Sequence, residues 1–231
     1  MSGSDHELAG KLYVVSTPIG NLKDITLRAI DVLSEVDLIA AEDTRHTRIL
    51  LEHYNIKTPT TSYFDFNKEK KIPHLLNRLR AGAAVALVSD AGTPGVSDPA
   101  FRLVRACIDN GMEIEMVPGA TAFVPALILS GLPTDRFVFE GFLPVKKGRR
   151  KRLELLAVER RTIILYESPY RIARTLTDLV THLGNRQAAI VRELTKKFEQ
   201  VARGSLDELI ENLPHMKLKG EFVLILAGKG D

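Results

Sequence analysis

The sequence has one cysteine, no tryptophan and no long apolar run among its 231 residues. The lone thiol, Cys107, excludes an internal disulfide and a cysteine-based zinc cluster, and so favours a reducing compartment. The longest apolar runs, residues 123–129 and 222–227, are well short of the roughly 18 residues that a membrane-spanning helix requires. The first ten residues, MSGSDHELAG, lack the apolar core of a signal peptide. We therefore expect a cytoplasmic protein with no membrane-bound segment.

Motifs that mark common nucleotide and metal sites are also missing. The chain contains no G-x-G-x-x-G, no G-x-x-x-x-G-K-[ST], no H-E-x-x-H and no C-x-x-C. These absences disfavour dinucleotide-binding folds, P-loop NTPases and zinc hydrolases. The six histidines are scattered, and the close pair His46 and His53 is seven residues apart on a predicted helix. This spacing offers no scaffold for a metal ion, so no metal site is expected.

Positive charge is concentrated in one part of the chain. Residues 146–203 contain 15 lysines and arginines against 6 aspartates and glutamates, whereas residues 1–145 contain 14 against 18. The densest stretch is K-K-G-R-R-K-R at residues 146–152. Two interpretations fit such a cluster. It is either a surface that binds a polyanion such as nucleic acid, or a solvated helix face that only improves solubility.

Short aliphatic runs alternate with longer amphipathic stretches, which predicts an α/β fold. The expected strands lie at residues 12–16, 38–41, 83–89, 113–117, 137–142, 162–166, 188–192, 199–203 and 222–226. The expected helices lie at residues 26–36, 44–54, 72–79, 99–110, 120–132, 168–183 and 206–213, with one more that ends near residue 159. A break at Pro118 divides this pattern into an N-terminal α/β domain, residues 1–118, and a C-terminal α/β domain, residues 119–231.

One helix start is marked clearly by its capping residues. Asp98 precedes Pro99, and proline is favourable in the first turn of a helix, so Asp98 is better explained as a helix cap than as a ligand. In the helix that follows, Phe101, Val104 and Ile108 have helical spacing and are expected to face the core.

Three turns that follow predicted strands are rich in Gly, Pro, Ser, Thr and Asp. They are S-T-P-I-G-N at residues 16–21, S-D-A-G-T-P-G-V-S-D-P at residues 89–99 and P-G-A-T-A at residues 118–122. Ligands of α/β sheets bind beyond the carboxyl ends of the strands, so these turns together predict a small-molecule site. Each turn taken alone is more simply explained as an ordinary connection.

Together with E-D-T-R at residues 42–45 and Y-E-S-P-Y-R at residues 166–171, these turns resemble the tetrapyrrole methylase superfamily. The resemblance extends over about residues 11–229, and within the superfamily the chain is most similar to members that methylate ribosomal RNA. It implies two α/β domains of the class III methyltransferase type, with S-adenosyl-L-methionine in a cleft between them, and a homodimer. The implied reaction is 2′-O-methylation of a cytidine in the decoding region of 16S rRNA, in the small ribosomal subunit.

Two details depart from the wider superfamily. Residues 17–21 contain one glycine rather than several, and Ser89-Asp90-Ala91 stands where many tetrapyrrole enzymes have Gly-Asp-Pro. These two departures are compatible with S-adenosyl-L-methionine as the cofactor, but they argue against a tetrapyrrole substrate. Two alternatives stay open: methylation of a tetrapyrrole or other small acidic metabolite, and a non-catalytic RNA-binding module.

The resemblance, together with the positions and charges of individual residues, suggests roles for them. Contact with the cofactor is expected for Pro18, Gly20, Asp90, Gly92, Thr93, Pro94, Gly95, Thr121 and Ala122. Three carboxylates that follow predicted strands, Glu42, Asp43 and Glu167, are candidates to accept the proton of the ribose hydroxyl. The pair at residues 42 and 43 is equally well explained as a cap of the next helix. Contact with RNA is expected for Arg45, Lys146, Lys147, Arg149, Arg150, Lys151, Arg152 and Arg171.

Aromatic residues are few among these candidates, although RNA recognition often adds aromatic stacking to phosphate contacts. Phe64, Phe66 and Tyr170 lie near the ends of predicted strands, and packing in the core is favoured for each of them.

Overall fold

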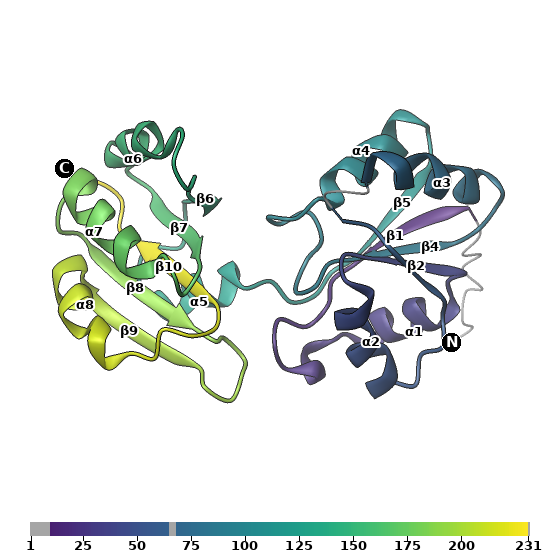
Figure 1. The fold of residues 1–231 in the computed structure, drawn as a ribbon, viewed down its shortest axis with the longest axis horizontal. Helices are drawn as coiled ribbons and strands as arrows, with labels where there is room; N and C mark the ends of the chain where they lie inside the picture. The colour runs from purple at the N-terminus through teal and green to yellow at the C-terminus, as the bar shows by residue number, and fades with distance from the viewer. Residues whose placement is uncertain (1–9, 65–67, 231) are drawn as a thin grey trace. The chain divides into compact units, whose positions relative to one another are not determined.

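The computed structural model describes residues 10–64 and 68–230, and the chain divides between Thr121 and Ala122 into two compact units (Figure 1). The sequence pattern places this division slightly earlier, at residue 118. Both units are α/β, as the alternation of short and long apolar segments predicts. Among the described residues, no helix has the length and apolar character that crossing a membrane requires.

The first unit contains a parallel sheet with the strand order β3-β2-β4-β1-β5. Its strands are β1 (Lys11–Val15), β2 (Leu38–Ala41), β3 (Thr60–Ser62), β4 (Val85–Val88) and β5 (Glu113–Val117). Its helices are η1 (Leu22–Asp24), α1 (Leu27–Glu35), α2 (Thr44–His53), α3 (Lys68–Arg80) and α4 (Ala100–Asp109). The sequence predicts β2 and β5 at their observed bounds and misses β3, whose three residues are polar.

Helices cover both faces of this sheet (Figure 1). Along β1, Tyr13 and Val15 belong to a core cluster with residues of α1 and α2. Leu12 and Val14 belong to a second cluster, with residues of α3 and α4. Side chains of a strand alternate between its two faces, so a strand that is covered on both sides appears in the sequence as a continuous apolar run.

Helix α4 presents a different face to the core from the one that the sequence predicts. Phe101 is 67% exposed and Ile108 is 55% exposed, so the prediction that they face inward is wrong. The buried residues are Ala100, Leu103 and Cys107, which have the same helical spacing one position earlier. Two of the three are small, which allows the helix to pack closely. Burial raises the pKa of the Cys107 thiol to about 11.

The second unit contains a mixed sheet with the strand order β6-β7-β10-β8-β9. Its strands are β6 (Phe137–Phe142), β7 (Thr162–Glu167), β8 (Gln187–Arg192), β9 (Gln200–Ser205) and β10 (Phe222–Leu226). Its helices are α5 (Phe123–Ser130), α6 (Arg149–Ala157), α7 (Ile172–Leu183), α8 (Leu206–Asn212) and η2 (Leu213–His215). Strands β6 and β7 are parallel, whereas β10 is antiparallel to both of its neighbours and β9 is antiparallel to β8.

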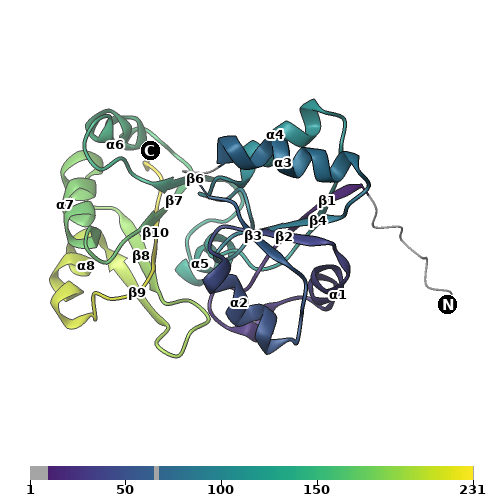
Figure 2. The ribbon, with the colours of Figure 1, turned by 45° about the vertical axis from the view of Figure 1, so that its right-hand side comes forward.

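Helices α6, α7 and α8 pack together on one side of this second sheet (Figure 2). Leu153, Leu176 and Leu209 are among the residues that these helices contribute to the core. Helix α5 contacts β8 and β10 and lies outside that core cluster. It begins at Phe123 and not at residue 120 as predicted, and it ends at Ser130 because Gly131 adopts the left-handed conformation with φ +73°.

Candidate functional site

Four loops of the first unit leave its sheet at one edge. Strands β1, β2, β4 and β5 are parallel, so the segments that follow them all begin at the carboxyl edge of the sheet. These segments are residues 16–21, 42–45, 89–99 and 118–121. Open α/β sheets bind their ligands at this edge. The turns that the sequence singles out are therefore brought together by the topology of the sheet.

Hydrogen bonds join three of these loops. The Thr17 amide donates to the Gly92 carbonyl over 2.9 Å, and the Gly92 amide donates to the Thr17 carbonyl over 3.1 Å. The hydroxyl oxygens of Ser16 and Thr93 are 3.0 Å apart, and Thr93 Oγ1 donates to the Ala120 carbonyl over 3.0 Å. The loops after β1, β4 and β5 consequently form one connected structure.

Two glycines permit this close approach. Gly92 has φ +81°, and a Cβ atom there would lie 3.2 Å from Ile19 Cγ2. A Cβ atom on Gly119 would lie 2.9 Å from Ser16 Cβ, which is closer than non-bonded carbon atoms pack. A larger residue at either position would push the loops apart, and the site therefore depends on glycine at both.

Asp90 connects the loop after β4 to the segment after β2. Its Oδ1 accepts a hydrogen bond from the Asp43 amide at 2.9 Å, and its own amide donates to Glu42 Oε2 over a longer 3.4 Å. Within residues 10–64 and 68–230, Asp90 Oδ2 accepts no hydrogen bond. The buried Ser89 hydroxyl also has no partner in that part of the chain. This edge therefore offers the second carboxylate oxygen of Asp90 to a ligand.

Asp43 is the N-cap residue of α2. Its Oδ1 accepts a hydrogen bond from the Arg45 amide at 2.8 Å, and the Arg45 guanidinium binds both of its carboxylate oxygens. These hydrogen bonds hold the pKa of the Asp43 carboxyl well below its usual range. Asp43 therefore has the geometry of a helix cap, as one of the two interpretations of the pair at residues 42 and 43 predicts.

The other candidates in this unit lie on the same loops. The Asp98 carboxylate accepts hydrogen bonds from the Gly95 amide, at 2.8 and 2.9 Å, and from the Ala100 amide at 2.8 Å, as expected of a residue that organises a helix start. The remaining cofactor candidates are Pro18 and Pro94, which are buried, Gly20 and Gly95, which are exposed, and Thr121, which is half-buried. Ala122 precedes α5 and begins the second unit.

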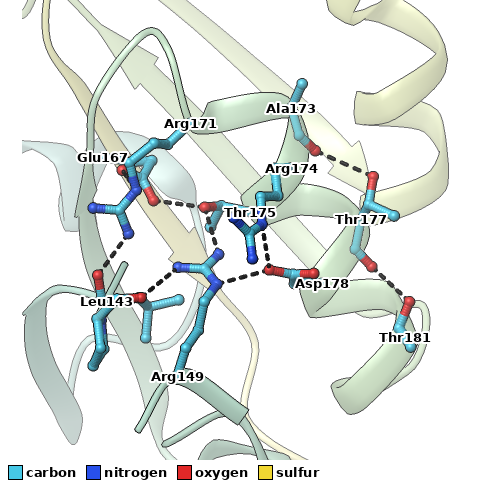
Figure 3. Close-up of polar contacts among 11 residues, drawn as sticks. Leu143, Arg149, Glu167, Arg171, Ala173, Arg174, Thr175, Thr177, Asp178 and Thr181 are labelled. Atoms are coloured by element: carbon cyan, nitrogen blue, oxygen red, sulfur yellow. Dashed lines mark hydrogen bonds and ion pairs between the residues drawn. The ribbon is translucent and has the colours of Figure 1, made fainter. Parts of the chain in front are cut away.

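In the second unit, candidate residues gather where β6 and β7 end. These two strands are parallel, so the loop at residues 143–148 and the turn at residues 168–171 leave the sheet at the same edge. The Arg171 guanidinium donates to the Leu143 carbonyl over 2.6 Å and so ties the turn to the loop (Figure 3).

Glu167 lies in a buried polar cluster at this edge (Figure 3). Its side chain is 0% exposed and lies 3.3 Å from Arg171 Nε. It accepts hydrogen bonds from the Ser168 amide at 2.8 Å and from the Thr175 hydroxyl at 2.6 Å. A carboxylate enclosed in this way does not come within hydrogen-bond reach of a ribose hydroxyl on another molecule. The structure therefore gives Glu167 a structural role and corrects its assignment as a catalytic base.

Arg149 belongs to the same cluster and is only 4% exposed. Its Nε donates to Asp178 Oδ2 over 2.7 Å, and its Nη2 donates to the Thr175 hydroxyl over 2.8 Å. Its Nη1 donates to the Pro144 carbonyl over 3.2 Å. These contacts lie inside the unit, so the assignment of Arg149 to RNA contact is corrected. No sequence motif marks Thr175 or Asp178, whose part in the cluster becomes visible only in the fold.

In the cationic segment at residues 146–152, the three lysines differ from the arginines in their side-chain partners. Lys146, Lys147 and Lys151 are exposed, and their side-chain ammonium groups make no ion pair or hydrogen bond with any residue that the structure describes. The exposed arginines have acidic partners, Glu154 for Arg150 and Glu140 for Arg152. In the described ranges, no group of three or more His, Cys, Asp and Glu side chains is placed to hold a metal ion.

Comparisons with known proteins identify relatives of the chain. Residues 11–210 match the family described as Tetrapyrrole (Corrin/Porphyrin) Methylases. A protein of Synechocystis sp. named "Ribosomal RNA small subunit methyltransferase I" is 56% identical over 221 residues, which cover 95% of this chain and 79% of that protein. A protein of the same name from Thermotoga maritima is 47% identical over 95% of this chain and 99% of its own length. Among solved structures, uroporphyrin-III C-methyltransferase from Thermus thermophilus, complexed with S-adenyl homocysteine, shares the fold, with a TM-score of 0.64 and 22% identity over 94% of this chain and 97% of that one.

Proposed function

Since the chain belongs to the tetrapyrrole methylase family, we propose that it transfers a methyl group from S-adenosylmethionine to the 2′-oxygen of a cytidine in the decoding region of 16S ribosomal RNA. The similarity to the two ribosomal RNA methyltransferases carries this proposal, because it extends over 95% of the chain. Methylation of ribosomal RNA with this donor is the general activity. The cytidine, its 2′-oxygen and the decoding region are the specific part of the proposal.

The joined loops of the first unit suit this cofactor. Its ribose hydroxyls and its ammonium group need hydrogen-bond acceptors, and Asp90 Oδ2 is an acceptor with no partner in the described part of the chain. Gly92 allows the loops after β1 and β4 to approach each other closely enough to pair through their backbones. When bound, the cofactor supplies an electrophilic methyl group on a positively charged sulfur.

Positioning of the ribose hydroxyl is the main contribution expected of the protein, because methyl transfer is an in-line displacement. A carboxylate near the hydroxyl also helps by accepting its proton or a hydrogen bond from it. Because Asp43 caps α2 and Glu167 is buried, Glu42 is the candidate carboxylate that remains. It is half-buried at the end of β2, where its Oε2 accepts the long hydrogen bond from the Asp90 amide. We assign the role of proton acceptor to Glu42.

The second unit supplies cations for the phosphate backbone of the RNA. Lysine and arginine contacts to phosphates account for most of the non-specific affinity of nucleic-acid-binding proteins. Lys146, Lys147 and Lys151 are exposed and have no acidic partner among the described residues. They therefore bind phosphates without breaking an ion pair, whereas Arg150 and Arg152 would have to exchange a carboxylate for a phosphate.

Replacing Lys146, Lys147 and Lys151 together by alanine is expected to weaken binding to small-subunit rRNA and to reduce its salt dependence. Each lysine that neutralises a phosphate of a single-stranded segment contributes about 0.7 to the slope of log K against log salt concentration, so the slope of the triple variant is expected to be smaller by about 2. Fluorescence anisotropy titrations of a labelled rRNA fragment at several salt concentrations measure both quantities.

The matched control replaces three exposed cations of the first unit, Lys57, Lys70 and Arg78, and changes the net charge by the same amount. Its affinity and its salt slope are expected to stay near those of the wild-type protein. Equal changes in the two triple variants would mean that only net charge matters, and the lysines would then not form a contact surface.

A further inference from the structure

We propose that Tyr170 stacks on an unpaired base of the bound RNA, next to the cationic loop at residues 143–148. The inference rests on the proposed function and deepens it, because it specifies that the RNA is held as a single-stranded segment. The stacking site lies entirely in the second unit.

The first observation is the exposure of the Tyr170 side chain. Tyr170 is 96% exposed, the highest value among the large hydrophobic residues in the part of the chain that the structure describes. The sequence favours core packing for this residue, and that prediction is wrong. Of the other two aromatic candidates, Phe64 is half-buried and Phe66 lies outside the described residues.

The second observation is that the turn carrying Tyr170 is attached to the cationic loop. The next residue, Arg171, donates from its guanidinium to the Leu143 carbonyl over 2.6 Å, and Arg149 donates to the Pro144 carbonyl over 3.2 Å (Figure 3). The turn and the loop also follow parallel strands, β7 and β6. An exposed aromatic ring and the exposed loop lysines, Lys146 and Lys147, are therefore carried by neighbouring connections at one edge of the sheet.

The third observation is that hydrogen bonds hold the turn at residues 168–171 in place. The Arg171 amide donates to the Ser168 carbonyl over 3.1 Å, and the Ser168 amide donates to Glu167 over 2.8 Å. Glu167 is in turn bound to the Thr175 hydroxyl of α7. An aromatic side chain on a fixed turn loses little conformational freedom when it binds, because only two side-chain torsions have to be ordered.

This combination matches the chemistry of single-stranded RNA. The phosphates of such a segment bind cations, and its unpaired bases offer π-faces on which an aromatic ring can stack. Paired bases of an RNA helix are already stacked on their neighbours and offer no such face. The excess of cations in residues 146–203, 15 against 6 acidic residues, favours a polyanion over a neutral protein surface. The exposed ring of Tyr170 favours RNA among polyanions, because unpaired bases offer a face on which it can stack.

A single tryptophan tests the contact directly. The chain contains no tryptophan, so Tyr170→Trp introduces one indole whose fluorescence reports on position 170 alone. Titration with a short single-stranded RNA of mixed sequence is expected to quench this fluorescence to saturation, and a double-stranded RNA of the same length is expected to quench it less. Phe101→Trp is the matched control, because Phe101 is an exposed aromatic residue of the first unit, and its fluorescence is expected to stay constant.

Affinities of two further variants separate stacking from charge. Tyr170→Ala is expected to bind the single-stranded RNA about tenfold more weakly, with an unchanged salt slope, because stacking releases no counterions. Tyr170→Phe keeps the ring and is expected to stay within about twofold of the wild-type affinity. The affinity for S-adenosylmethionine, measured by calorimetry, is expected to be the same in both variants.

The outcomes of these experiments distinguish failure of the stacking from failure of the proposed function. If the wild-type protein binds RNA but Tyr170→Ala binds equally well and Tyr170→Trp is not quenched, the stacking is refuted and the proposed function stands. A reduced salt slope in Tyr170→Ala would mean that this residue orders the cations, which also refutes stacking. If the wild-type protein neither binds nor methylates RNA, both the stacking and the proposed function are refuted.

Discussion

Replacing Arg149 by methionine is expected to lower the free energy of unfolding by about 3 kcal/mol. The guanidinium is buried, and it donates to Asp178, to Thr175 and to a backbone carbonyl. Methionine fills a similar volume but donates no hydrogen bond. It therefore leaves the Thr175 hydroxyl and the Pro144 carbonyl without this donor, and it leaves Asp178 only its longer ion pair with Arg174, at 3.8 Å. Urea unfolding followed by circular dichroism measures the effect as a lower midpoint at an unchanged m-value.

The adjacent residue supplies the control. Arg150 has the same charge and also pairs with a carboxylate, Glu154 at 2.7 Å, but its side chain is 84% exposed. Ion pairs at the surface contribute about 0–1 kcal/mol, so Arg150→Met is expected to unfold close to the wild-type midpoint. Equal midpoints for the two variants would show that the cluster around Glu167 does not stabilise the second unit.

Replacing Gly92 by valine is expected to lower the affinity for S-adenosylmethionine about a hundredfold. Gly92 has φ +81°, which strains a β-branched residue, and its Cβ atom would lie 3.2 Å from Ile19 Cγ2. Together these effects raise the free energy of the binding conformation of the loop by about 2–3 kcal/mol. The loop of the variant therefore moves away from Thr17, and the cofactor binds only the small fraction of molecules whose loop is in the original conformation. Calorimetric titration of the variant with the cofactor measures the loss.

Gly111→Val separates loop geometry from backbone strain. Gly111 has φ +65° and therefore carries a similar conformational penalty, but a Cβ atom there meets nothing within 4 Å. It follows Asn110, the C-cap residue of α4, and lies outside the loops that form the candidate site. The control is expected to lose stability and to keep its cofactor affinity. Wild-type affinity in Gly92→Val would mean that the joined loops do not bind the cofactor.

Much of the fold could be predicted from local patterns in the sequence. Strands β2 and β10 are buried at every residue, so each appears as an apolar run between polar turns, and both are predicted at their observed bounds. The parallel order of the first sheet then explains why the candidate loops, each of which directly follows a strand, lie at one edge of the sheet. Strand β3 is too short and too polar to produce such a signal.

What the sequence could not predict depends on contacts between distant residues. Arg149 and Lys151 look equivalent within a run of cations, yet Thr175 and Asp178 on α7 bury the first of them and leave the second exposed. The two apolar stripes of α4 have the same spacing, and only packing decides which one is buried. The pairing direction of β10 likewise depends on its partners and not on its own residues.

Methyl transfer to ribosomal RNA is tested most directly by mapping the product. The protein is incubated with isotopically labelled S-adenosylmethionine and either isolated small ribosomal subunits or a tetrapyrrole precursor. Mass spectrometry then locates the label, in nuclease fragments of the rRNA or in the tetrapyrrole itself. We expect the label on the 2′-oxygen of one cytidine in the decoding region, and no label on the tetrapyrrole. Unlabelled rRNA, or label on the tetrapyrrole in its place, would contradict the proposed function.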